Sequence, residues 1–572
     1  MNKKVKVGIL LSKWEVDYWE YTLIKGILDA DFAEVVLVVF EVPKTEAGTE
    51  TGAFSGGWIY KTYGLIKRIL KAPFKPHFLY HLYCFSRIED FIKKRLRKPN
   101  AFEKVSIKDI LENVPIINVT PERSLKFSDY IADADCKLIM QYQPDMLLRL
   151  AFRILRGGIL TAPPCGIWSF HHADNSINRG GPPAIWEILL NQRVSGITLQ
   201  IITESLDGGQ VLERVFLTTN APFAIRNYNK LLMNSTPVLL RQLRNLSTLG
   251  NKAFMERVRQ CNPIRFYSKP LYRSPTNGAM AIGVIRAYGS FIWKKYFESW
   301  VEKKQWFLLY KIQNSVATSF YQFKEIVPPS DRFWADPFVV HKDGLYYVFF
   351  EEVTFSDNKG RISMLTIDEN GNVSDAMPVL DLDQHLSYPS IIEHGGYYYM
   401  LPETNQTKME LFRCESFPDR WEPCAVLFDK TPFADPSLYF HDGYWWLFVT
   451  ELVNYTGIGD TLSVYYRKEL LSGEWTPHPM NPVVCDPRNA RSAGQIFLHD
   501  GRIYRPSQDC SEHYGYGITL NEIVTLNSEV YHERVISRAT PDWRKGLVSC
   551  HTFNFCGKLT IIDAERIKYF KR

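Results

Sequence analysis

The sequence predicts two domains of different class, an α/β Rossmann-like domain followed by an all-β five-bladed propeller. Three observations predict this division. The chain has 572 residues, more than a single hydrophobic core usually serves. Strand and helix signals alternate up to about residue 245. From about residue 305 the pattern changes to short aromatic strands that recur at a regular interval.

The α/β domain is predicted over residues 1–245. Apolar runs rich in β-branched residues predict strands, and helical stretches lie between them. This alternation is typical of a parallel sheet covered by helices. The predicted strands are "KVKVGILL", "EVVLVVFEV", "PDMLLRLAF" and "GITLQIIT", and the predicted helices are Tyr18–Ala30 and "PPAIWEILLNQ". Residues 45–130 are interpreted as an insertion or helical excursion whose path the sequence does not define.

The propeller is predicted over residues 305–572 from four copies of a strand–turn–strand unit. The copies recur every 47 to 58 residues, a spacing typical of propeller blades, and turn at Asp-Gly or Gly-Gly pairs. They read "ADPFVVHKDG", "YPSIIEHGG", "DPSLYFHDG" and "AGQIFLHDG". A fifth unit is predicted from "QWFLLYKI" and the final "KLTIIDAERI", which would close it from both ends. A sandwich with accidental internal similarity is the alternative.

Residues 246–304 form a basic, aromatic connector with helical spacing. We interpret it as a packed helix. The alternative is a helix that lies on a membrane surface and presents Lys294 and Lys295 to it.

The composition limits the partners and the compartment. The ten cysteines include no CxxC pair, which favours a reduced cytoplasmic protein, membrane-associated in the alternative version. The net charge of +6 is small for this length, so it favours anionic small molecules over nucleic acid. The first residues read as a strand rather than a signal peptide. The sequence does not predict the oligomeric state.

A histidine and a carboxylate are expected to meet at the ligand-binding edge of the α/β sheet. His171 follows "GIWSF", where a buried strand would end. Asp207 lies 36 residues later in the Gly-flanked loop "SLDGGQVL". Open α/β sheets bind ligands at the carboxyl ends of their strands. A histidine and an aspartate meeting there can act as a base or stabilise an oxyanion.

The segments "PDMLLRLAFRILRGGIL", "GIWSFHH" and "GGPPAIWEILLNQRVSGITLQIITESLDGGQVL" resemble the formyltransferase family that uses 10-formyltetrahydrofolate. The resemblance covers about residues 135–215. It implies a Rossmann-like formyltransferase domain in which a primary amine attacks the formyl carbon. It also implies catalytic roles for His171 and Asp207, and it assigns cofactor contacts to Phe152, Arg153, Ile154, Leu155 and Gly208.

One position departs from the family pattern. The family's asparagine, which helps to hold the oxyanion two residues before the histidine, is Ser169 here. Loss of an oxyanion donor typically lowers the rate by about 10²–10³. Either Ser169, a water molecule or His172 takes the place of the asparagine, or formyl transfer has been lost.

The second part resembles the amino-terminal propeller of plant glucosamine inositolphosphorylceramide transferases over about residues 330–520. The matching segments are "ADPF", "LSYPSI", "MLPE", "RSAGQIF" and "YRPSQDC". It also distantly resembles five-bladed glycoside hydrolases of the arabinanase class. The resemblance implies a carbohydrate ligand. The residues expected to bind it are Asp336, Asp435, Arg491, Gln508 and Asp509, and no metal site is expected.

The leading hypothesis is an N-formyltransferase for an amino sugar, nucleotide-linked in the favoured version, in surface-polysaccharide biosynthesis. The propeller would bind carbohydrate. In the alternative, the propeller carries a glycoside hydrolase or glycosyltransferase-associated activity and the first domain is degenerate. A non-catalytic scaffold is the third hypothesis. Formylation of tRNA is disfavoured, because the family's carboxyl-terminal tRNA-binding barrel has no counterpart here.

Overall fold

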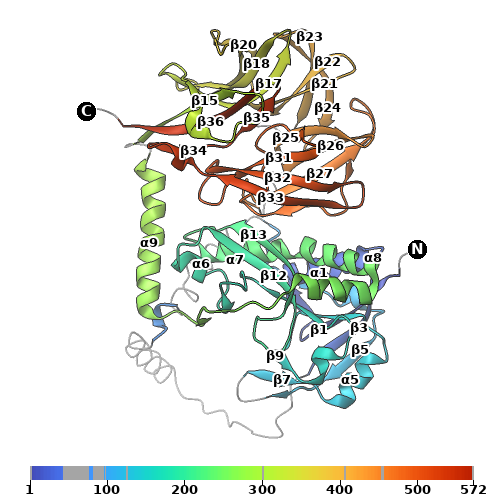
Figure 1. Ribbon diagram of the computed structural model, residues 1–572. Coiled ribbons are helices and arrows are strands. Elements are labelled where there is room, and N and C mark those ends of the chain that lie inside the picture. The colour runs from blue at the N-terminus through green and yellow to red at the C-terminus, as the bar shows by residue number, and fades with distance from the viewer. Residues whose placement is uncertain are drawn as a thin grey trace. The chain divides into compact units, whose positions relative to one another are not determined.

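In the computed structural model the chain divides into two compact units, residues 1–291 and 292–572 (Figure 1). The division falls inside helix α9 (Asn277–Tyr296), so the predicted connector contributes to both units. Most of the predicted insertion, 45–130, lies outside the described residues. The structure describes residues 3–42, 76–80, 96, 98–123, 127–298, 302–404, 408–451 and 456–569.

A seven-stranded mixed sheet forms the centre of the first unit, in the order β13-β12-β10-β8-β1-β3-β5. Strands β10, β8, β1, β3 and β5 pair in parallel, whereas β12 pairs antiparallel with both of its neighbours, β10 and β13. The strands are β1 (Val5–Leu11), β3 (Ala33–Glu41), β5 (Ile116–Val119), β8 (Met146–Arg149), β10 (Ile167–His171), β12 (Val194–Ile201) and β13 (Gln210–Thr218).

The direction of β12 differs from the parallel sheet that the alternation predicted. The helix between β10 and β12 is α6 (Trp186–Leu189), which has only four residues. At 1.5 Å per residue it is about 6 Å long, too short to carry the chain back along the sheet. The chain therefore returns in the opposite direction and pairs with β10 as an antiparallel neighbour.

Helices cover the sheet and bury its apolar side chains. Helices α1 (Tyr18–Asp29) and α8 (Ser235–Cys261) contact each other and the sheet (Figure 1). Helix α5 (Asp133–Met140) packs on a core that includes Leu10 and Leu147. The other elements of this unit are β2 (Glu15–Asp17), β4 (Lys104–Ser106), β6 (Glu122–Arg123), β7 (Ser128–Tyr130), β9 (Ile154–Arg156), β11 (Arg179–Gly180), α7 (Ala224–Met233) and β14 (Leu271–Tyr272).

Helix α9 is packed on one side only. It buries Met280, Gly283 and Ala287, whereas Ile282 and Ile285 are 70% and 73% exposed. In the part of the chain that the structure describes, no helix combines the length and the apolar character that crossing a membrane requires. Contact of the connector with a membrane surface stays a prediction.

The second unit consists of five antiparallel sheets (Figure 1). The first four follow one another along the chain, and the fifth combines strands from both ends of the unit. The strands are, in the first sheet, β17 (Arg332–Lys342), β18 (Leu345–Thr354), β19 (Gly360–Asp368) and β20 (Met377–Leu380); in the second, β21 (Leu386–His394), β22 (Tyr397–Thr404), β23 (Met409–Ser416) and β24 (Arg420–Phe428); in the third, β25 (Phe433–His441), β26 (Tyr444–Glu451), β27 (Thr461–Arg467), β28 (Thr476–Pro477) and β29 (Val484–Cys485); in the fourth, β30 (Phe497–His499), β31 (Arg502–Asp509), β32 (Gly517–Leu526) and β33 (Tyr531–Ala539); and in the fifth, β15 (Glu302–Ile312), β16 (Lys324–Ile326), β34 (Leu547–Ser549), β35 (Phe553–Cys556) and β36 (Leu559–Tyr569).

Apolar cores join the five sheets into a closed ring, since each core contains side chains of two neighbouring sheets. Strand β15 pairs with β36 along its whole length, so both ends of the unit are held in one sheet. The cores contain Phe349 with Met400, Leu401 with Leu447, Phe448 with Ile523, Ile518 with Ile562, and Ile561 with Val348.

The repeated sequence unit has a repeated backbone conformation. Asp336, Tyr388 and Asp435 all have a φ near +50°, and each lies at a bulge in the first strand of its sheet. Left-handed backbone is unfavourable for residues other than glycine unless the surrounding structure maintains it. In the fourth copy Ala493 occupies this place, and the positive φ lies one residue later, at Gly494, with a φ of +130°.

We expect stability to depend on the sheet that closes the ring. Ile562 of β36 is fully buried opposite Leu309, so Ile562→Ala should lower the free energy of unfolding by about 2–5 kcal/mol. Denaturant unfolding of the full chain measures this. The matched control is Ile536→Ala in β33, where the side chain is 45% exposed and a change of about 0.5 kcal/mol or less is expected. Equal effects of the two substitutions would contradict this account.

Candidate functional site

His171 and Asp207 lie next to each other in the first unit. His171 is the last residue of β10, and Asp207 lies in the loop between β12 and β13 with a φ of +48°. The Nδ1 atom of His171 is 3.5 Å from Oδ1 of Asp207. Their side chains are 9% and 18% exposed, which makes the pair largely buried at the carboxyl end of a parallel strand.

Backbone groups in the segment between His171 and Asp207 form hydrogen bonds with both side chains. The backbone carbonyl of Asn178 accepts a hydrogen bond from Nε2 of His171 at 2.7 Å. Because a carbonyl oxygen can only accept, Nε2 carries a proton. The backbone N–H of Gly180 donates to Oδ2 of Asp207 at 2.8 Å. The orientation of the ring and that of the carboxylate are therefore both set by backbone groups.

Ser169 lies two residues before His171 on β10 and has a charged partner. The Nη1 atom of Arg149 donates to Oγ of Ser169 at 2.9 Å, and Nη2 donates to the carbonyl of Phe152 at 3.1 Å. Burial lowers the pKa of the Arg149 guanidinium, and the negative charges of Asp207 and Asp129 oppose this effect. Since Oγ already accepts a hydrogen bond from the guanidinium, the Ser169 hydroxyl hydrogen is available to donate.

His172 has a structural environment, unlike its neighbour. Its Nε2 atom is 3.1 Å from Oγ of Ser235, and the rings of Trp19 and Tyr228 contact it edge-on. Burial, together with the charge of His171, lowers the pKa of His172 to about 3. His172 is therefore a neutral ring enclosed by aromatic side chains and bonded to Ser235.

The residues predicted to hold the cofactor mostly face the protein. Phe152 and Leu155 belong to the apolar core, at 8% and 1% exposure. The Arg153 side chain donates to Asp129 at 2.8 Å, while Ile154 is half-buried in β9. A Cβ atom on Gly208 would lie 2.7 Å from Nη1 of Arg179, so the backbone there is closely approached. Phe152, Arg153 and Leu155 are therefore engaged within the protein, and of the predicted contacts in this loop the half-buried Ile154 side chain is the one left to meet a ligand.

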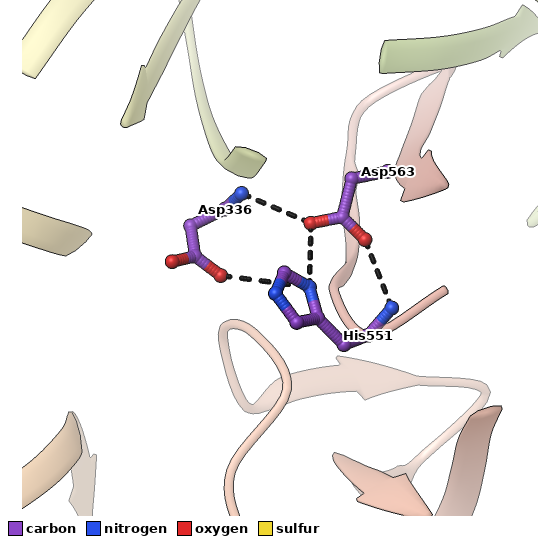
Figure 2. A group of neighbouring side chains, drawn as sticks. All are labelled: Asp336, His551 and Asp563. Atoms are coloured by element: carbon purple, nitrogen blue, oxygen red, sulfur yellow. Dashed lines mark hydrogen bonds and ion pairs between the residues drawn. The ribbon is translucent and has the colours of Figure 1, made fainter. Parts of the chain in front are cut away.

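In the second unit, Asp336 belongs to a buried ion-pair network with His551 and Asp563 (Figure 2). His551 Nδ1 is 2.7 Å from Oδ2 of Asp563, and the Asp563 carboxylate also accepts the backbone N–H groups of Asp336, His551 and Thr552. Trp306 stacks on the His551 ring at 4.0 Å. Ligand atoms of the three titratable residues lie within 4.8 Å of one another. Donation of an Nδ1 proton to Asp563 accounts for this spacing without a metal ion.

The pKa values in this network depend on burial and pairing. Burial raises the pKa of Asp336 to about 7, which the positive charge of His551 opposes and the charge of Glu351 reinforces. Burial alone would lower the pKa of His551, but the charges of Asp563 and Asp336 raise it to about 9. His551 is therefore positively charged at neutral pH.

A second buried network brings together three of the predicted carbohydrate-binding residues. Arg491 donates to both carboxylate oxygens of Asp435, and Nε2 of Gln508 donates to Oδ2 of Asp435 at 2.8 Å. Oε2 of Glu403 lies 3.7 Å from Nη2 of Arg491. Burial and the charge of Asp435 hold the pKa of Glu403 well above its usual range.

Asp509 and Tyr514 lie differently in this unit. Asp509 accepts the backbone N–H of Ser511 at 2.9 Å, and none of the hydrogen bonds described joins it to the Asp435 network. The Tyr514 ring lies 4.9 Å below the Arg491 guanidinium and 5.5 Å from the His551 ring, so it contacts both networks. With 44% of its surface exposed, Tyr514 offers a flat apolar face beside buried polar groups.

Several residues of these networks were missed from the sequence. Arg149 and Asp563 are charged residues that directly follow the apolar runs "MLL" and "II" of predicted strands. A charge in a strand predicted to be buried was the available signal, since buried charges are rare unless they are paired. Asn178 and Thr552 had no such signal, because their contacts use backbone atoms or a common hydroxyl.

The comparisons with known proteins include one family model. Residues 273–554 match a family model described as the N-terminal region of glucosamine inositolphosphorylceramide transferase 1. Glucosamine inositolphosphorylceramide transferase 1 of Oryza sativa subsp. japonica is 35% identical over 221 residues, 38% of this chain and 29% of that protein. The chain thus spans less than a third of that relative. The predicted resemblance to this plant protein is confirmed.

The comparisons also include formyltransferases and a glycoside hydrolase. Methionyl-tRNA formyltransferase of Chlorobium limicola is 27% identical over 134 residues, 23% of this chain and 38% of that protein. The solved α-L-arabinanase of Cellvibrio cellulosa, complexed with arabinohexaose, covers 35% of this chain and 77% of its own. Its TM-score is 0.27, with 15% sequence identity.

The stability of the second unit should fall at alkaline pH. The folded-state pKa of His551, about 9, is above the ordinary value of 6.5, so its contribution is complete below pH 6.5 and is lost as the pH rises through 9. The shift corresponds to about 3 kcal/mol. Thermal unfolding between pH 6.5 and 10 should show a steeper decline for the unmodified chain than for His551→Gln. Parallel curves would contradict the assignment of a charged His551.

Proposed function

We propose that this chain is an N-formyltransferase that moves a formyl group from 10-formyltetrahydrofolate to the amine of an amino sugar. The observation that carries the proposal is the 3.5 Å approach of His171 to Asp207 at the carboxyl end of β10. A buried imidazole held by a carboxylate is suited to proton transfer and to binding an oxygen that gains negative charge.

In this proposal the first unit is a Rossmann-like formyltransferase domain, and the ring of five sheets is a five-bladed propeller. The resemblance of residues 135–215 to formyltransferases and the short match to the Chlorobium enzyme support the first assignment. The closed cycle of five apolar cores supports the second.

The cofactor would lie along the backbone of residues 152–155 and beside Gly208. When bound, 10-formyltetrahydrofolate supplies the formyl carbon that the amine attacks. The half-buried side chain of Ile154 would contact it, and Gly208 lies against Arg179 of the chain itself. The core positions of Phe152 and Leu155 keep this loop fixed before the cofactor arrives.

The residues of the chain would then stabilise charge and remove a proton. The Ser169 hydroxyl donates a hydrogen bond to the formyl oxygen as it becomes negative, and the Nε2–H of His171 would join it by leaving the Asn178 carbonyl when the ligand binds. Asp207 holds the imidazole and helps to accept the proton released by the amine, which would pass to the folate nitrogen as its bond to the formyl carbon breaks. Arg149 supports Ser169, because a guanidinium that donates to Oγ makes the hydroxyl a stronger hydrogen-bond donor. This arrangement replaces the asparagine that the family resemblance leads one to expect.

The propeller would bind the carbohydrate. The network of Asp435, Arg491 and Gln508, with the exposed Tyr514 ring beside it, offers polar groups and a stacking face. The rice relative's name includes glucosamine, an amino sugar, which supports an amino-sugar ligand. We place the reaction in the cytoplasm, in surface-polysaccharide biosynthesis, with the connector touching the membrane.

Substitutions at Ser169 and His171 test the proposed activity. With 10-formyltetrahydrofolate and a panel of nucleotide-linked amino sugars, His171→Ala should abolish transfer. Ser169→Ala should lower the rate by about 10²–10³, and Arg149→Met should add little to it in the double variant. Ser235→Ala is the matched control, because its hydroxyl contacts His172 instead, and it should keep its activity. Transfer that is absent from the unmodified chain, or that persists in His171→Ala, rules the proposal out.

A glycoside hydrolase activity of the propeller is the second candidate. The observation in its favour is Asp336, a buried carboxyl group whose pKa of about 7 suits a general acid. Against it, Asp435 is paired with Arg491 and does not provide a second free carboxylate.

Asp336→Asn distinguishes the two candidates. If the propeller is a hydrolase, release of sugar from aryl glycosides should be lost in Asp336→Asn and unchanged in His171→Ala. If the formyltransferase proposal is correct, the unmodified chain releases no sugar. Hydrolysis that survives Asp336→Asn would exclude this carboxyl group as the acid.

A further inference from the structure

Two arginines beside the His171–Asp207 pair are anchored on a single residue. The Nε atom of Arg179 donates to the backbone carbonyl of Asn175 at 3.0 Å, and the Nε atom of Arg214 donates to its side-chain Oδ1 at 2.9 Å. Both guanidinium groups are thereby held at their Nε atoms. The terminal Nη1 and Nη2 atoms of the two arginines take no part in these two hydrogen bonds.

Asn175 is itself part of the built site. It is 2% exposed, and its Nδ2 atom donates to the carbonyl of Asp207 at 3.2 Å and to Gln200 at 3.3 Å. Arg179 also packs on the Tyr267 ring at 4.2 Å. Buried hydrogen bonds and a cation–π contact reduce the freedom of long arginine side chains, which lowers the entropic cost of binding a ligand.

The terminal nitrogens of this pair have spare hydrogen-bonding capacity. Among the residues that the structure describes, no hydrogen-bond acceptor is found for the terminal nitrogens of Arg179 or Arg214. The nearest acid is Asp174, whose Oδ1 is 3.6 Å from Nε of Arg214 and already accepts two hydrogen bonds from Ser176. Of the two arginines, Arg214 has an ion-pair partner in Asp174, and no ion pair joins Arg179 to an acid among the described residues.

A third arginine adds to this charge. The pKa of Arg214 is lowered mainly by burial, an effect that Asp174 opposes and that the positive charges of Arg265 and Arg179 reinforce. An anion placed between these groups would relieve the repulsion. The charge is therefore better matched to a doubly charged ligand than to a neutral sugar.

The position of the pair links it to the proposed catalytic residues. Arg179 lies between Asn178, whose carbonyl accepts from His171, and Gly180, whose N–H donates to Asp207. A ligand group bound by Arg179 is thus next to the segment that orients both residues. Gly208 adjoins the same guanidinium, because a Cβ there would lie 2.7 Å from Nη1.

We propose that Arg179 and Arg214 form a phosphate-binding site for the acceptor, which is a phosphorylated or nucleotide-linked amino sugar rather than a free one. This proposal rests on the proposed function. Planar guanidinium groups bind phosphate oxygens in a bidentate manner, and two of them anchored on the same residue suit a phosphate or diphosphate. The phosphate would position the sugar amine relative to His171.

Equilibrium binding of inorganic pyrophosphate and of uridine diphosphate to the full chain tests this site by isothermal titration. We expect Arg179→Gln and Arg214→Gln each to weaken binding by about 10- to 100-fold, the range for a lost charge-assisted contact. Arg179→Lys and Arg214→Lys should bind with intermediate strength, because lysine keeps the positive charge but lacks the planar guanidinium group that binds two phosphate oxygens at once. Arg257→Gln, an exposed position on α8, is the matched control and should bind like the unmodified chain.

Two further measurements separate the outcomes. Thermal unfolding is measured for each lysine variant. An unfolding temperature like that of the unmodified chain shows that the fold is kept, so weaker binding by that variant reports on the site. Unchanged pyrophosphate affinity in all four variants overturns the proposal. The same titrations are also made with 5-formyltetrahydrofolate. If the arginine variants bind this folate more weakly but bind pyrophosphate normally, the proposal is overturned, because the arginines would then bind the glutamate carboxylates of the folate. Arginine-dependent pyrophosphate binding without any formyl transfer would support the site and reject the proposed function.

Discussion

The approach of the His171 ring to the Asp207 carboxylate depends on the backbone of one short segment, residues 175–180. Within it, the Asn178 carbonyl accepts from His171 and the Gly180 N–H donates to Asp207. Backbone groups cannot rotate away as side chains can, so the pair is oriented before any ligand binds. The same segment carries Arg179. A change in its conformation would therefore disturb the proposed catalytic pair and the proposed phosphate site together.

In the second unit the constraint is the burial of charge. A buried charge loses its hydration and is unfavourable unless an opposite charge and hydrogen bonds compensate. The ring of sheets meets this condition with the pairs Arg491–Asp435, His551–Asp563 and Arg505–Glu533. The left-handed residues Asp336 and Asp435 take part in these networks directly. The strained bulges and the ion pairs therefore maintain each other.

Features set by neighbouring residues could be predicted from the sequence. The strand–turn–strand units, their Asp-Gly and Gly-Gly turns and the position of His171 at the end of a strand all follow from local pattern. The antiparallel direction of β12 could not be predicted, because it depends on how far α6 extends. The core positions of Phe152 and Leu155 were not predicted either, since a loop sequence does not reveal which face packs inward.

The sequence by itself determined the change of pattern along the chain, the four recurring strand–turn–strand units and the residue types near His171 and Asp207. These depend on composition and on spacing along the chain. Tertiary structure alone decided which groups pair, as when the Asp336 N–H meets the carboxylate of Asp563, 227 residues away. Such partners depend on closure of the ring. Each buried charge or hydrogen-bonding group pairs with a group on the strand that packs next to it, and that strand can be distant in the sequence.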